Sequence, residues 1–163
     1  MSDKALYVLA GYDEITDMRL SSIQNTLYEN GFTGTQTKNI PQHITLGSFP
    51  TEKETELTDL LKRLSIEVTS FKITFNHVGV FGGARVLFVA PDTSAQLLNL
   101  KEMFGDSYNW TPHTTMLIDT PDTIYKAVPL VMEKFSAFEG KVTSLHLYEF
   151  FPTRHIVSVW FEQ

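Results

Sequence analysis

Hydrophobic positions in the first half of the chain form two strand-like runs and two helical patterns in alternating order. The strand-like segments are short apolar runs, whereas the helical segments repeat apolar residues every three or four positions. Along the chain they predict a strand at 4–13, a helix at 13–30, a strand at 41–49 and a helix at 52–64. Asn30-Gly31 is a typical helix stop and sets the end of the first helix.

The second half repeats this order after a pair of strands. Residues 70–92 predict two strands joined by a turn at Gly82-Gly83, and the apolar residues of the first strand alternate with polar ones. Then follow a predicted helix at 93–105, a strand at 109–120, a helix at 121–135, and two strands at 140–163 with a turn near Pro152. Pro129 is expected to bend or shorten the helix at 121–135.

The segments of the two halves also correspond to one another. The matching segments are ARVLFVAPD (84–92) and ALYVLAGYD (5–13), PHTTMLI (112–118) and QHITLGS (42–48), and KVTSLHLYEF (141–150) and FKITFNHVGVF (71–81). We therefore predict an α+β fold in which two similar β-α-β-α-β halves are related by a pseudo-twofold axis. Mainly antiparallel sheets would line a shared central cleft, with the helices outside, in a single domain of two lobes spanning residues 1–163.

One tripeptide pattern, His-x-Thr, stands in corresponding strands of both halves. Side chains alternate along a strand, so His43 and Thr45 share one face, and His113 and Thr115 share one face of the other strand. A twofold axis between the halves would bring both polar faces into one cleft. Thr114 points to the opposite face and is less apolar than a core position favours, so we expect the second strand to be packed less deeply.

Two imidazoles and two hydroxyls in one cleft suit the cleavage of a phosphodiester. Imidazole has an unperturbed pKa of about 6.5, so one histidine can take a proton from a nucleophile while the other gives one to the leaving oxygen. Threonine hydroxyls can donate hydrogen bonds to the non-bridging phosphate oxygens. A single histidine in a strand is more often structural, and the symmetric placement of the pair is what favours catalysis.

Composition narrows the class of protein. The chain has 163 residues, of which 42% are hydrophobic and 20% charged, which is typical of one globular domain. Its net charge of −6 disfavours binding of long nucleic acid, which depends on Lys and Arg. The absence of cysteine excludes disulfides and thiolate metal sites. Without a recognisable signal peptide or long apolar stretch, we expect a cytoplasmic protein that does not bind membranes.

The motifs HITL (43–46) and HTTM (113–116) resemble the signature of the 2H phosphoesterase superfamily, which includes bacterial 2′-5′ RNA ligase and cyclic phosphodiesterase proteins. The resemblance covers essentially the whole chain. It implies that His43 and His113 are the acid/base pair and that Thr45 and Thr115 bind phosphate, with no cofactor. It also implies a metal-independent phosphoesterase acting on 2′,3′-cyclic phosphate RNA ends or on small cyclic or 2′-5′ linked nucleotides.

Four aromatic residues are candidates for binding the substrate. Phe81 lies in the stretch HVGVFGG, where the resemblance implies an aromatic residue that can stack on a nucleobase. Tyr12 and Trp110 flank strands that carry or neighbour the motifs, and Phe151 lies at the last predicted turn. Each could line the cleft, and each could equally be a packing residue.

Basic candidates for binding phosphate are few. Arg85 and Arg154 stand at the same turn-to-strand point in each half, although both could be solvated turn residues. The scarcity of basic residues favours a small nucleotide or an RNA terminus as the partner. We expect the protein to be a monomer. We expect the other three histidines, His77, His146 and His155, to be structural.

Two alternatives to catalysis without metal stay open. An inactive relative could keep the cleft and capture a nucleotide or RNA end without turnover, which the net acidity would suit. A hydrolase could also use the same histidines as metal ligands, although the chain has no HExxH motif and no EF-hand loop.

Overall fold

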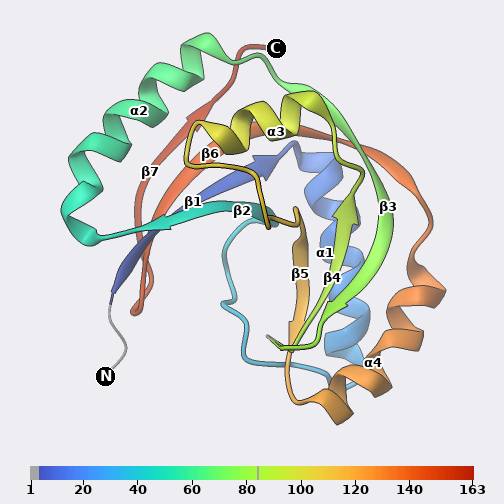
Figure 1. The fold of residues 1–163 in the computed structure, drawn as a ribbon. Helices are drawn as coiled ribbons and strands as arrows, with labels where there is room; N and C mark the ends of the chain where they lie inside the picture. The colour runs from blue at the N-terminus through green and yellow to red at the C-terminus, as the bar shows by residue number, and fades with distance from the viewer. Residues whose placement is uncertain (1–3, 84) are drawn as a thin grey trace.

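The computed structural model describes residues 4–83 and 85–163, so the first three residues of the predicted domain and Ala84 of the predicted strand 84–92 lie outside the description. Seven strands are present: β1 (Ala5–Tyr12), β2 (His43–Phe49), β3 (Phe71–Phe81), β4 (Val86–Pro91), β5 (Thr114–Ile118), β6 (Phe138–Phe150) and β7 (Arg154–Trp160). The helices are α1 (Glu14–Glu29), the 3-10 helix η1 (Thr51–Lys53), α2 (Glu54–Glu67), α3 (Ala95–Glu102) and α4 (Pro121–Lys134). This order of elements confirms the predicted α+β class (Figure 1).

All of these strands belong to one antiparallel sheet, whose order is β2-β1-β6-β3-β4-β5 with β7 added beside β6. Exchanging β1 with β4, β2 with β5 and β3 with β6 turns this order into its own reverse, which is the predicted pseudo-twofold relation. Two details differ from the prediction. The halves form one continuous sheet because β6 pairs with both β1 and β3, and β7 has no counterpart among the described residues of the first half.

The predicted stop of the first helix is present, and a side chain also caps the start of this helix. Asp13 accepts a hydrogen bond from the Thr16 amide at the start of α1, and Gly31 follows the helix with φ of 86°, a conformation that favours glycine. Pro129 does not shorten α4, which continues to Lys134. Pro129 and Tyr125 are exposed, so the carbonyl that loses its helical partner can be hydrated instead.

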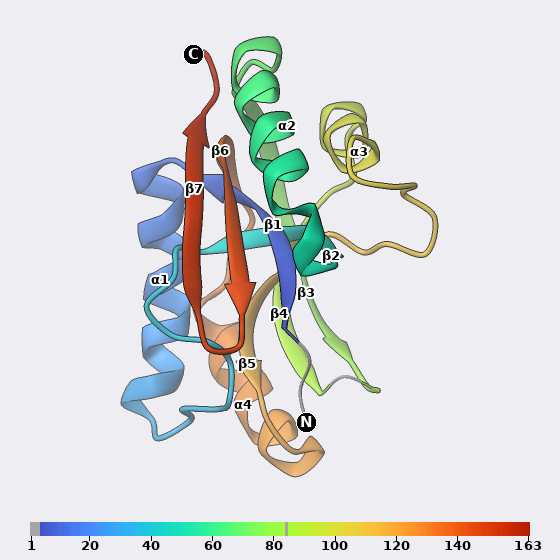
Figure 2. The same ribbon diagram turned by 90° about the vertical axis from the view of Figure 1, so that its left-hand side faces the viewer.

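The two faces of the sheet have different roles. One face carries the main core, in which alternate strand residues pack with the apolar residues of all four α-helices. Figure 2 shows α1 on one side of the molecule, with α2 and α3 near one end and α4 near the other. The opposite face, which we call the motif face, carries His43, Thr45, His113 and Thr115 and two small clusters, around Leu9 and around Phe88.

A β-bulge stands at the same place in each half. The register between β1 and β2 skips Leu46, and the register between β4 and β5 skips Met116. Each bulged residue directly follows a His-x-Thr triplet and is fully buried. A bulge bends its strand and increases the local twist, so both motifs are turned in the same way. The symmetry of the halves therefore extends to the irregularity beside the motifs.

Candidate active site

The two motif strands lie at opposite ends of the sheet order, yet they touch. The hydroxyl of Thr114 in β5 donates a hydrogen bond of 2.9 Å to the carbonyl of His43 in β2. The indole of Trp110 donates one of 3.2 Å to the carbonyl of Thr45. The sheet therefore curls until its end strands meet, and the meeting point is the pair of motifs (Figure 1).

Thr114 corrects the expectation of a loosely packed second strand, because its side chain is only 1% exposed. Its hydroxyl also lies 2.6 Å from the Tyr12 hydroxyl. Since the single proton of Thr114 is donated to the His43 carbonyl, the Tyr12 hydroxyl must donate to Thr114. Tyr12, offered above as a residue lining the cleft, is thus buried behind the motifs, and burial raises the pKa of its hydroxyl.

Both motif histidines are held in the same way. The Nδ1 atom of His43 lies 2.8 Å from the Pro41 carbonyl, and that of His113 lies 2.8 Å from the Thr111 carbonyl. A carbonyl oxygen only accepts, so Nδ1 carries the proton in each ring. The neutral form of each ring therefore has its lone pair on Nε2. The prediction of an acid/base pair requires this arrangement.

Burial lowers the pKa of both histidines. Loss of hydration is the largest cause at each site, and the hydrogen bond to the backbone carbonyl opposes it. Charge repulsion from His113 adds to the lowering of the pKa of His43. Both rings are thus predominantly neutral at pH 7.

The surroundings of the two rings differ. His113 packs edge-on against Phe81, with ring centroids 4.7 Å apart, and against Phe88 at 5.3 Å. Phe81 therefore lies at the candidate site as predicted, in contact with the histidine itself. Phe88 is a contact that the sequence did not predict, because its strand is a plain buried run.

On the other side, His43 and Thr45 line a cavity of about 260 Å³. Thr114 and Thr115 line it from β5, Tyr7 and Phe151 from β1 and the β6–β7 turn, and residues 36–37 and 40–42 from the loop before β2. Phe151 is thus placed at the cavity, as the sequence suggested, and 56% of its surface is exposed. No lysine or arginine is among the lining residues, which all lie in the described part of the chain.

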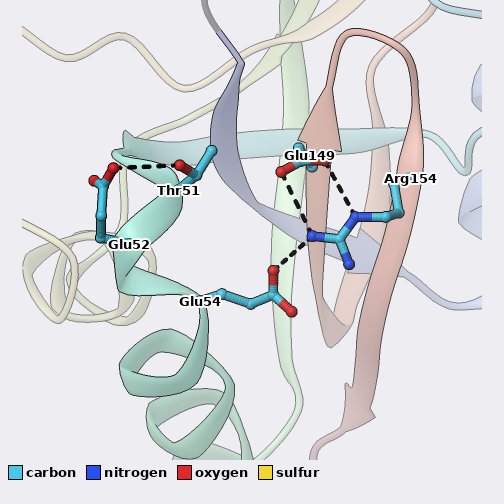
Figure 3. A network of polar contacts seen from close by, with 5 residues as sticks. All are labelled: Thr51, Glu52, Glu54, Glu149 and Arg154. Atoms are coloured by element: carbon cyan, nitrogen blue, oxygen red, sulfur yellow. Dashed lines mark hydrogen bonds and ion pairs between the residues drawn. The ribbon is translucent and has the colours of Figure 1, made fainter.

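Three predicted substrate-binding residues lie elsewhere. Trp110 supports the β2 backbone and does not line the cavity. Arg85 is exposed and lines a separate apolar hollow beside α4. Arg154 binds Glu149 at 3.1 Å and Glu54 at 2.5 Å, so its charge is already balanced (Figure 3). Its contact lowers the pKa of the Glu149 carboxyl.

The remaining histidines also lie on the motif face. Strand register places His146 beside Leu9, His155 beside Tyr148, and His77 beside Ala90, each on the side that carries the motifs. His146 is buried between Ser144 and Ser158, and loss of hydration lowers its pKa to about 4. His146 therefore has the expected structural role, whereas His77 and His155 are exposed.

The paired motifs and the fold that holds them are those of the 2H phosphoesterase superfamily. A family model described as the 2′-5′ RNA ligase superfamily matches residues 12–150, and the chain therefore belongs to this superfamily. No protein of curated function matches the sequence significantly.

Solved structures share the fold over nearly the whole chain. E. coli LigT in complex with ATP is 20% identical with a TM-score of 0.65, covering 98% of both chains. A structure described only as a phosphoesterase is 17% identical with a TM-score of 0.62, covering 99% of this chain and 100% of that one. A protein of Thermus thermophilus is 15% identical with a TM-score of 0.64, covering 96% of this chain and 97% of that one.

The described part of the chain contains neither a cluster of metal-ligating side chains nor a membrane-spanning helix. Within residues 4–83 and 85–163, no group of three or more His, Asp or Glu side chains is placed to hold a metal ion. No helix in the same part of the chain is long and apolar enough to cross a membrane.

Proposed function

We propose that the protein is a metal-independent phosphoesterase acting on 2′,3′-cyclic phosphate RNA ends or on small cyclic or 2′-5′ linked nucleotides. The observation that carries the proposal is the joining of the two motif strands by Thr114, with the Nδ1 proton of each histidine bound to a carbonyl. In this proposal the Nε2 atoms of His43 and His113 act together on one phosphate. Family membership and the shared fold support a phosphoesterase of this class.

The reaction needs one histidine in each protonation state. The neutral histidine takes a proton on Nε2 from water or from a ribose hydroxyl, whose oxygen then attacks phosphorus. The protonated histidine donates its Nε2 proton to the leaving oxygen as the P–O bond breaks. Thr45 and Thr115 donate hydrogen bonds to the non-bridging oxygens, on which charge develops. In the reverse direction the two histidines exchange roles.

The cavity favours a small substrate with a single phosphate at the site. Its lining combines hydroxyls and amides with Tyr7, Ile40 and Phe151, which suits a ribose and a base better than a second phosphate. With no lysine or arginine among these lining residues, a polyphosphate would be poorly neutralised. E. coli LigT has been solved in complex with 3′-AMP, which supports a nucleotide with a single phosphate as a ligand of the fold.

The experiment is a substrate panel with products identified by mass spectrometry. It contains 2′,3′-cyclic mononucleotides, 2′-5′ linked dinucleotides and cyclic dinucleotides, each assayed with and without a chelator. We expect turnover of at least one member at a rate that the chelator does not change. Calorimetric binding without any product would favour a binding module, and loss of activity in chelator would favour a metal-dependent hydrolase.

A further inference from the structure

Another histidine of the motif face lies two strand spacings from His113, outside the cavity and the acid/base pair. His77 in β3 binds Asp92, with His77 Nε2 and Asp92 Oδ1 separated by 2.8 Å, and both side chains are about half exposed. The side-chain amide of Asn76 lies 3.4 Å from the same carboxylate oxygen. This group, which we call the His77 dyad, has no part in the reaction described above.

The position of His77 follows from a bulge. Phe71, Ile73 and Phe75 point into the core, so strict alternation would bury His77 as well. The register between β3 and β4 instead skips Asn76, and this turns His77 to the motif face, where it pairs with Ala90.

Ala90 lies between His77 and His113. Val89 pairs with Thr114, so the next residue, Ala90, lies beside His113. Two strand spacings therefore separate the backbones of His77 and His113, a distance of about 10 Å. The Ala90 side chain is small and buried, with 4% of its surface exposed, so it does not project between the two rings. A nucleoside attached to a phosphate at His113 can bridge this distance.

The equivalent place in the other half is closed. Under the pseudo-twofold relation His77 corresponds to Ser144, because Gly11 lies between Ser144 and His43 as Ala90 lies between His77 and His113. Ser144 is only 2% exposed, and its hydroxyl lies 2.9 Å from His146. Ser144 is therefore not free to bind a ligand in the half that contains the cavity. In the half that contains His113, His77 is exposed at the equivalent position.

The hydrogen bond to Asp92 decides what His77 can bind. A carboxylate oxygen accepts, so Nε2 carries the proton and the neutral ring keeps a lone pair on Nδ1. Within residues 4–83 and 85–163 no protein group is bound to this Nδ1 atom. An acceptor fixed in orientation by a carboxylate suits a hydroxyl donor.

We propose that the His77 dyad binds a ribose hydroxyl of the nucleoside on the His113 side of the scissile phosphate. This inference rests on the proposed function, because it needs the phosphate at the two motifs. It identifies the substrate class as a phosphodiester that joins two nucleosides, with one in the cavity and the other over β4 and β3. A 2′,3′-cyclic mononucleotide fills only the first of these places.

The test compares His77→Ala and His77→Asn on two substrates. One is a 2′-5′ linked dinucleotide, and the other is the same dinucleotide without the ribose hydroxyls of the nucleoside on the His113 side. Loss of one neutral hydrogen bond predicts a rise in KM of about three- to tenfold for the first substrate with His77→Ala. The dinucleotide without these hydroxyls should lose much less. Asn keeps a side-chain acceptor near the place of Nδ1 and should restore part of the difference.

His155→Ala is the matched control, since it also removes an exposed imidazole that binds a neighbouring side chain on the motif face. It should change neither KM. Equal effects of His77→Ala on both dinucleotides would overturn the inference while the proposed function stands. If the wild type turns over no substrate, calorimetry with the dinucleotide separates the two proposals. Binding weakened by His77→Ala then supports the dyad, and unchanged or absent binding overturns it.

Discussion

Replacing Thr114 with valine tests whether the two motif strands are joined as the structure shows. Valine keeps the shape of threonine and removes its hydroxyl, so the Tyr12 hydroxyl and the His43 carbonyl both lose a partner in the buried interior. The lost bond to His43 should cost about 1 kcal/mol, and an unsatisfied buried hydroxyl on Tyr12 a further 1–3 kcal/mol or so. We expect Thr114→Val to lower the free energy of unfolding by about 2–4 kcal/mol.

The companion variants separate these contributions. Tyr12→Phe removes one neutral hydrogen bond and should cost about 1 kcal/mol. The double variant has no orphaned tyrosine hydroxyl, so it should be more stable than Thr114→Val alone by roughly 1–3 kcal/mol. Urea unfolding of the four proteins, followed by tryptophan fluorescence, measures the cycle. A double variant as unstable as the sum of the single variants would refute the chain from Tyr12 through Thr114 to His43.

Activity gives a second reading of the same cycle. The bond to the His43 carbonyl is missing in Thr114→Val and in the double variant, so kcat/KM should be reduced in both. Tyr12→Phe keeps that bond and should retain most of the wild-type rate. Recovery of activity in the double variant would show that the stability of the protein, rather than the position of His43, limits the rate.

Four further predictions concern the pH profile of activity, the pH dependence of stability, a glycine and an arginine. Because burial lowers the pKa of both His43 and His113, the pH profile of kcat/KM should have its maximum below pH 6.5, and a maximum above pH 7 would contradict this electrostatic account. His146 has a pKa of about 4 in the folded protein and 6.5 when exposed, so the unfolded chain binds more protons between these two pH values. The free energy of unfolding should therefore fall by up to about 3 kcal/mol as the pH is lowered from 6.5 to 4. The decline should be smaller in His146→Gln, as measured by urea unfolding at pH 7 and pH 4. Gly11→Ala should destabilise the protein by about 1–3 kcal/mol, because the added carbon would overlap Ser144 Oγ and lie 2.5 Å from His146 Nε2. An unchanged midpoint of urea unfolding would contradict this and show that the two side chains move aside. Arg154→Gln should leave KM within about twofold of wild type, because Arg154 binds Glu54 and Glu149 rather than the site, and a large rise in KM would return Arg154 to the substrate.

Much of the fold could be predicted because strands and helices differ in period. The alternation in His43–Leu46 gives the face of each motif residue, and the distance between the two motifs along the chain indicates the repeat. The bulges could not be predicted in this way, because a skipped residue depends on the neighbouring strand. The bulge at Asn76 is the instructive case, since it moves His77 from the core face, where alternation places it, to the motif face.

The hydrogen-bond partners of the polar side chains could not be predicted from the hydrophobic pattern either. Thr114 looked like a weak core residue, and only the meeting of β2 and β5 shows that its hydroxyl joins Tyr12 to His43. A polar residue at an apolar position was the available signal. Arg154 looked like a phosphate ligand because its partner Glu54 lies a hundred residues earlier in the chain. Contacts of this kind depend on the tertiary structure, which local periodicity does not encode.

The central claim is that His43 and His113 form one acid/base pair, and kinetics of their alanine variants test it most directly. Each single variant should lose more than about a hundredfold in kcat on the best substrate of the panel, as loss of a general acid or base does. Because the two residues act as a unit, kcat of the double variant should be only slightly below that of the less active single variant. Either single variant retaining activity within about tenfold of wild type, or losses that multiply in the double variant, would contradict the account.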